Sequence, residues 1–126
     1  METRRIPEKY DLLAPDQSEI RLLVSTGRGS MVHCTLPAGE TSLAVTHRTV
    51  EEIWFFLGGR GEVWRKNETG EATTKVEPGV SLAIPLGAHF QFRNTGEEPF
   101  TFVIVTMPPW PGDEEAVRVA DHWPAG

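Results

Sequence analysis

The stretch VTHRTVEEIWFFLGGRGEVW, residues 45–64, places one histidine and two adjacent glutamates directly before an aromatic and aliphatic run. In an extended strand, residues two apart point to the same side. Two sets share a face by this rule: Val45 with His47, and Glu52 with Trp54 and Phe56. The pattern predicts strands whose inner face is largely aromatic and also carries an imidazole and a carboxyl group.

Outward from this stretch, turn signals rich in Gly, Pro and Asn recur along the chain, for example at 25–30, 67–71 and 94–99. Between them lie short runs rich in β-branched and aromatic residues. Short strands separated by regular turns are typical of an all-β sandwich or barrel. Before residue 112 no segment keeps helical periodicity, and only 113–120 has a pattern suited to a helical turn or two.

Length and charge exclude several classes of protein. The chain has 126 residues, which favours one domain, and a formal net charge of −6, which gives no basic surface for nucleic acid or anionic lipid. The longest apolar run, 53–57, is too short to cross a membrane, and no apolar stretch follows the charged start as a signal peptide requires. The single cysteine, Cys34, excludes an internal disulfide, so a cytoplasmic protein is expected.

Two motifs carry a resemblance to a known family. The first runs from Gly39 through His47 and Glu52 to Gly59, and the second from Gly79 through Pro85 and Gly87 to Asn94. In spacing they resemble the two motifs of the cupin superfamily, which are small barrels of jelly-roll type. The resemblance implies a single-domain antiparallel jelly-roll β-barrel over 1–126. Its core motifs would lie within 37–94, between an N-terminal arm (1–18) and a proline-rich C-terminal tail (107–126).

The departures from the family pattern concern its metal site. In the family, three histidines and a glutamate hold the metal; this sequence keeps His47 and Glu52 but has Val45 and Phe90 at the other two positions. His89 lies one residue too early, and a shift of one residue turns a strand side chain to the opposite face. Two protein ligands are too few for a typical catalytic metal, so no cofactor is expected.

A divalent transition metal would need replacement ligands. Such a site would use His47 and Glu52 together with His33 or His89. Alternation places His89 outside the barrel and leaves the facing of His33 open.

The inner face predicts a ligand pocket with a few polar groups in an aromatic wall. Its expected lining is Val45, His47, Glu52, Trp54, Phe56, Phe90 and Phe92. The opposite set on the late strand, His89, Gln91 and Arg93, has the pattern of a solvated face. The alternative is that the aromatic residues only fill the barrel, and that His47 and Glu52 form a buried hydrogen-bonded pair.

Three functions fit these observations. The first is binding of a small, partly apolar or aromatic molecule in the barrel. The second is an enzyme: the resemblance implies metal-dependent dioxygenases, isomerases, epimerases or decarboxylases, and a metal-free enzyme would use His47 as general base, oriented by Glu52. The third is a structural or regulatory module that acts as a dimer. The identity of the ligand is not predicted.

A homodimer is expected on two grounds. Small relatives commonly dimerise, which the resemblance implies. In addition, Leu12, Leu13 and Trp110 lie in the segments that flank the barrel, where an early segment could add to a neighbour's sheet edge and cover them. The alternative is that the tail folds back over its own barrel, with Trp110 as a lid.

Overall fold

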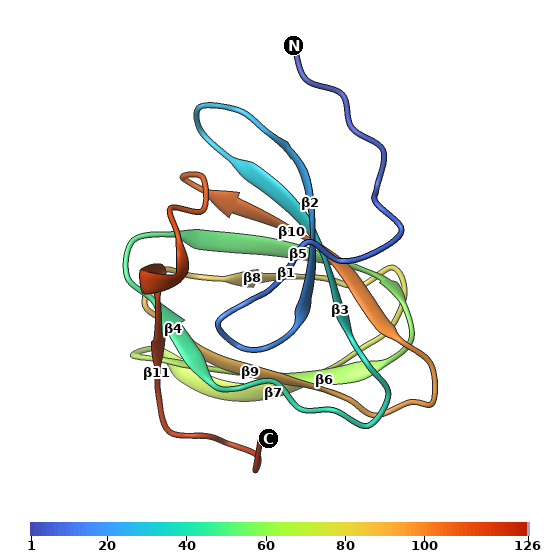
Figure 1. The fold of residues 1–126 in the computed structure, drawn as a ribbon. Coiled ribbons are helices and arrows are strands. Elements are labelled where there is room, and N and C mark those ends of the chain that lie inside the picture. Colours follow the sequence, from blue (N-terminus) through green and yellow to red (C-terminus); the bar gives the residue numbers. More distant parts are fainter. Residues whose placement is uncertain (126) are drawn as a thin grey trace.

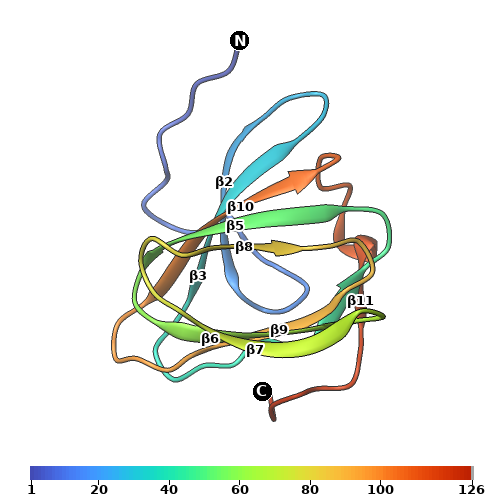
Figure 2. The ribbon, with the colours of Figure 1, turned by 180° about the vertical axis from the view of Figure 1, so that it is seen from behind.

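The computed structural model describes residues 1–125 as two antiparallel sheets that enclose one core, with one short 3-10 turn, η1 (Asp113–Glu115), as their only helical segment. In Figure 1 the two sheets lie across from each other, and Figure 2 shows the same pair from behind. The all-β jelly-roll prediction is confirmed. None of the segments described is a helix long and apolar enough to cross a membrane.

The six-stranded sheet has the order β1-β2-β3-β10-β5-β8. Its strands are β1 (Leu12–Leu13), β2 (Glu19–Ser25), β3 (Ser30–Leu36), β10 (Phe100–Met107), β5 (Glu51–Gly58) and β8 (Ser81–Ile84). The five-stranded sheet has the order β11-β4-β9-β6-β7. Its strands are β11 (Ala116–Arg118), β4 (Val45–His47), β9 (His89–Asn94), β6 (Gly61–Asn67) and β7 (Gly70–Val76).

Aromatic side chains fill the core beneath the inner face of β5. Trp54 stacks on Phe102 with ring centroids 4.7 Å apart, and Phe102 in turn lies 4.9 Å from Phe56. Phe92 and Phe100 complete this cluster, and all five side chains are buried. The strict alternation of buried and exposed residues along β5 explains the arrangement, because every second side chain points into the barrel.

The C-terminal tail differs from the prediction after the prolines. The pattern of 113–120 predicts a helical turn or two. One such turn, η1, is present, but it is followed by β11, which pairs with β4 and places Ala116 opposite His47. A short edge strand of three residues carries too little periodicity to be recognised from sequence.

The expectation that Gln91 faces solvent is wrong, because the end of the chain covers it. Gln91 is fully buried, and its Nε2 donates to the carbonyl oxygens of Ser42 (2.8 Å) and Trp123 (2.9 Å). Its Oε1 accepts from the backbone N–H groups of His122 and Trp123. All four hydrogen-bonding positions of the amide are therefore used, as burial requires.

The N-terminal arm forms its own edge strand. β1 pairs with β2 of the same chain, while Leu12 and Leu13 remain 40% and 50% exposed. The residues before β1 run beside β2, where the Ser25 N–H donates to Glu2 Oε1 and Arg21 donates to the carbonyl oxygens of Pro7 and Glu8. The arm therefore extends the six-stranded sheet and leaves its apolar side chains largely uncovered.

Candidate functional site

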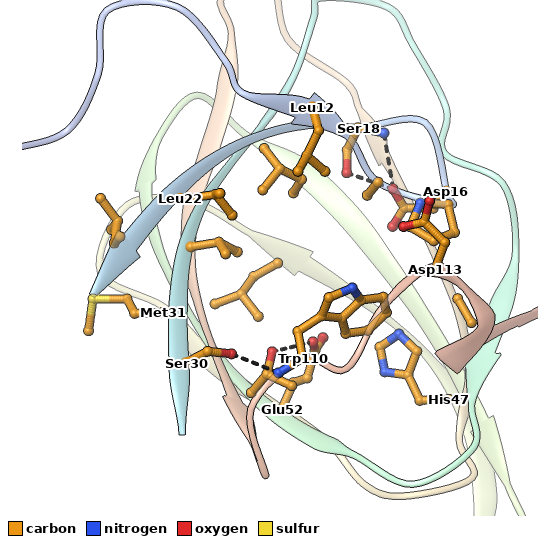
Figure 3. Close-up of a pocket in the computed structure, with 18 of the residues that line it drawn as sticks. Leu12, Asp16, Ser18, Leu22, Ser30, Met31, His47, Glu52, Trp110 and Asp113 are labelled. Atoms are coloured by element: carbon orange, nitrogen blue, oxygen red, sulfur yellow. Dashed lines mark hydrogen bonds between the residues drawn. The ribbon is translucent and has the colours of Figure 1, made fainter. Parts of the chain in front are cut away.

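A cavity of about 440 Å³ lies between the two sheets, lined by strands of both. Figure 3 shows that side chains from the arm, the barrel and the tail surround it. Its apolar wall includes Ile20, Leu22, Val32, Val45, Trp54, Phe90 and Ile104, and its polar groups include Asp16, His47, Glu52, Thr106 and Asp113. The cavity is therefore mostly hydrocarbon, with a few acidic groups and one imidazole.

Glu52 is held on the inner face of β5 by two neutral donors. Its Oε1 accepts from Trp54 Nε1 at 3.0 Å, and its Oε2 accepts from Thr106 Oγ1 at 2.7 Å. Thr106 is the direct cross-strand partner of Glu52 on β10. Burial raises the pKa of Glu52 to about 7, although both hydrogen bonds oppose the shift. Near neutral pH this carboxyl group can therefore either accept or release a proton.

His47 lies on β4 between two aromatic rings. Its ring centroid is 5.1 Å from that of Phe90 and 5.2 Å from that of Trp110, both in edge arrangements. Only 7% of the residue is exposed, and its Nδ1 has no hydrogen-bond partner. Burial lowers the pKa of His47 to about 4, against the attraction of Glu115, so the ring is neutral at pH 7.

The hydrogen-bonded pair of His47 and Glu52 is not present. Both carboxylate oxygens of Glu52 accept from other groups, and His47 Nδ1 is unpartnered. Facing and spacing alone could not distinguish two side chains in one cavity from two in contact. Glu52 consequently does not orient His47 as a general base.

Phe90 and Val45 occupy the two positions where the family carries histidines. They are direct cross-strand partners on β9 and β4, both are buried, and both line the cavity. The ring of Phe90 also meets that of Trp54 at 5.5 Å. The two substitutions thus form one continuous hydrocarbon surface beside His47.

Phe56 and Phe92 were expected in the pocket, but they do not line the cavity. Each lies two residues beyond a lining residue on the same strand, Trp54 or Phe90, and packs in the aromatic cluster. The barrel is therefore filled at this depth, and the open space begins at Trp54.

Asp16 was not predicted as a site residue. It is 9% exposed, and its Oδ1 accepts from the Ser18 N–H (3.0 Å) and Ser18 Oγ (2.6 Å). Burial raises the pKa of Asp16, against these two hydrogen bonds. The Asp-x-Ser pattern was the available signal, but it is equally typical of an exposed turn.

Trp110 lies over the same cavity, close to His47 (Figure 3). Its backbone N–H donates to Ser30 Oγ at 3.0 Å, which ties the proline-rich segment to the start of β3. This is the arrangement expected if the tail folds back over its own barrel.

The donor set does not fit a resident transition metal. His33 lies on the face of β3 opposite the buried Cys34 and Leu36, and His89 lines a separate surface hollow beside Lys66. Neither can join His47 and Glu52. Residues 1–125 contain no cluster of three or more His, Cys, Asp or Glu side chains suited to a metal ion.

Removing each ionisable group in turn should separate two opposing pH effects on stability. Glu52 binds its proton more tightly in the folded state, so its contribution to the free energy of unfolding falls as the pH rises from about 4.5 to about 7. His47 binds its proton less tightly when folded, so its contribution rises between about pH 4 and 6.5.

Relative to the wild type, the stability of Glu52→Gln should therefore rise over its interval, by about 3 kcal/mol at most. That of His47→Gln should fall over its own interval. Urea unfolding at a series of pH values measures both. Stability curves parallel to the wild type would contradict the two pKa shifts.

Comparison with known proteins agrees with this architecture. The family profile described as Cupin domain matches residues 32–106. An uncharacterized protein of Methanocaldococcus jannaschii is 28% identical over 121 residues, covering 89% of this chain and 94% of the relative.

Solved structures share the fold at low sequence identity. An uncharacterized protein with a double-stranded β-helix domain from Klebsiella pneumoniae superposes with a TM-score of 0.68 at 18% identity, covering 94% of this chain and 91% of the other. An oxalate decarboxylase from Lactobacillus farciminis, in its formate complex, gives a TM-score of 0.70 at 20% identity, covering 81% of this chain but 31% of the other. Because the family profile spans more than half of the sequence and the two-sheet barrel agrees with it, the chain belongs to the cupin family.

Proposed function

We propose that the barrel binds a small, largely apolar or aromatic molecule and does so without a resident metal ion. The observation that carries the proposal is the 440 Å³ cavity with a mostly hydrocarbon wall, a size within the usual range for small-molecule sites. Its polar groups are few, and four of them, Asp16, His47, Glu52 and Thr106, are buried. One of them, His47, has an unpartnered nitrogen, which costs stability unless a ligand or water satisfies it.

The competing proposal is a metal-dependent enzyme. The decarboxylase from Lactobacillus farciminis shares the fold, but fold alone does not transfer an activity. Val45 and Phe90 also remove two donors from the place where the family binds its metal. Metal-free binding is therefore the better-supported function.

Metal content tests this choice directly. Elemental analysis of the purified protein should find well under one equivalent of iron, zinc, manganese, nickel or copper, and the His47→Ala variant should give the same value. Near-stoichiometric metal in the wild type, lost in His47→Ala, would instead establish a metal site.

Indole serves as a neutral aromatic probe of the cavity. Because a ligand that binds only the folded state stabilises it, the temperature of unfolding should rise with indole concentration. The Leu22→Trp variant places a bulky ring in the cavity wall and should abolish the shift.

The matched control for this test is Leu13→Trp, since Leu13 is exposed and lies outside the cavity. It should respond as the wild type does. An indole shift of equal size in Leu22→Trp, or none in the wild type, would count against binding in the barrel.

A second candidate function, a dimeric module, is favoured by the outer face of the six-stranded sheet. Ile53, Phe55 and Leu57 point outward from β5 and are 50%, 47% and 46% exposed. Val103 and Val105 flank them on β10 in direct register. Two copies of a chain with net charge −6 repel one another, and the patch formed by these five apolar side chains is a place where they can meet without opposing like charges. We infer a homodimer through this face, in place of the edge pairing by residues 1–18.

Two substitutions that introduce a glutamate distinguish a dimer interface on the outer face of the six-stranded sheet from one at its edge strand β1. Light scattering at micromolar concentration should give about twice the chain mass for the wild type and the chain mass for Phe55→Glu, because a buried carboxylate disrupts the interface. Leu13→Glu, on the edge strand β1, should remain dimeric. A monomeric wild type would end the dimer proposal, and a monomer only in Leu13→Glu would assign the interface to the edge.

A further inference from the structure

Three of the four acidic residues that line the cavity have no counter-charge; the fourth, Glu2, pairs with Arg4. Glu52 and Asp16 are 5% and 9% exposed, and each is stabilised only by neutral hydrogen-bond donors. Asp113 adds a third carboxyl group to the lining. None of the ion pairs among residues 1–125 involves these three.

Basic groups do not offset them. Among the described residues that line the cavity, the only arginine or lysine is Arg4, and its guanidinium pairs with Glu2 at 3.3 Å. His47 also lines the cavity but is neutral near pH 7. The acidic interior therefore favours a positively charged ligand over a negative one. Burying a carboxylate is costly when it has no cationic partner.

A second observation points to a ligand at the same place. His47 is more than nine-tenths buried, faces the cavity and has an Nδ1 without a partner. Around it stand the rings of Phe90 and Trp110, and Trp54 continues this wall. Aromatic rings beside carboxylates are the combination that recognises organic ammonium groups, through the ring quadrupole and through charge.

We propose that the cavity selects an organic cation, an ammonium group carried on a compact apolar or aromatic body. The ammonium would lie toward Glu52 and Asp16, and the body against the wall formed by Val45, Phe90 and Ile104. An anion of the same shape would meet uncompensated carboxylates, and a neutral molecule would leave them unpaired. This inference rests on the proposed function, since it names the ligand class of the same cavity.

Three probes of matched shape test the inference: 2-phenylethylammonium, 2-phenylethanol and phenylacetate. Isothermal titration at about pH 8, where the amine keeps its charge, gives each dissociation constant. The ammonium should bind about tenfold or more tightly than the alcohol, and the carboxylate should bind most weakly.

Charge-neutralising variants locate the effect. Glu52→Gln retains an oxygen that can accept from Trp54 Nε1, and Asp16→Asn retains one for Ser18, so both should fold. Each should reduce the preference for ammonium over alcohol severalfold while leaving the affinity for 2-phenylethanol nearly unchanged. Asp113→Asn offers an exposed substitution with the same expected direction, and the exposed Glu97→Gln, outside the cavity, should change nothing.

The outcomes separate this inference from the function on which it rests. Equal binding of ammonium and alcohol, or preferred binding of phenylacetate, would overturn cation selection and leave small-molecule binding intact. A preference that persists in Glu52→Gln, Asp16→Asn and Asp113→Asn would also overturn it. Failure of all three probes to bind would count against both proposals.

Discussion

The site depends on the burial of one carboxyl group, that of Glu52, inside the barrel with hydrogen-bond donors but no cation beside it. Glu52 is anchored by Trp54 from its own strand and by Thr106 from the neighbouring strand β10. Two neutral donors satisfy the oxygens but do not offset the loss of hydration of a full charge, so burial raises the pKa of Glu52 to about 7. The Trp54 ring also stacks on the core through Phe102, and this contact connects the position of the carboxyl group to the packing of the barrel.

The hydrocarbon surface beside this carboxyl group has a simple geometric origin. Val45 and Phe90 are far apart in sequence but directly paired across β4 and β9. Because the two positions are neighbours, an apolar residue at both of the family's histidine positions makes one continuous hydrocarbon patch and not two separate apolar spots. A single replacement would leave a hydrophobic side chain beside an imidazole; together the two make a wall against which an apolar body can pack.

Much of this site could be predicted because it follows from local rules. The period of two along a strand placed His47, Glu52 and Phe90 inward and His89 outward, and motif spacing set the register. The same rule does not measure depth, so it could not tell that Phe92 lies below the cavity. It also does not show what covers a sheet: Gln91 faces away from the barrel interior as predicted, yet it is buried by residues about thirty positions later in the chain.

The segments outside the core motifs contribute three of the seven polar and aromatic groups on which selectivity depends. Residues 37–94 supply His47, Glu52, Trp54 and Phe90, whereas Asp16 comes from the arm and Trp110 and Asp113 come from the tail. Arm and tail are attached by specific hydrogen bonds, from the Leu43 N–H to the Asp16 carbonyl oxygen and from the Trp110 N–H to the Ser30 side-chain Oγ. Loop and terminal segments can change without disturbing the packed barrel. Two barrels with the same motifs could therefore differ in the charge of their cavities, and here the arm and the tail both add carboxyl groups where the motifs have already placed one.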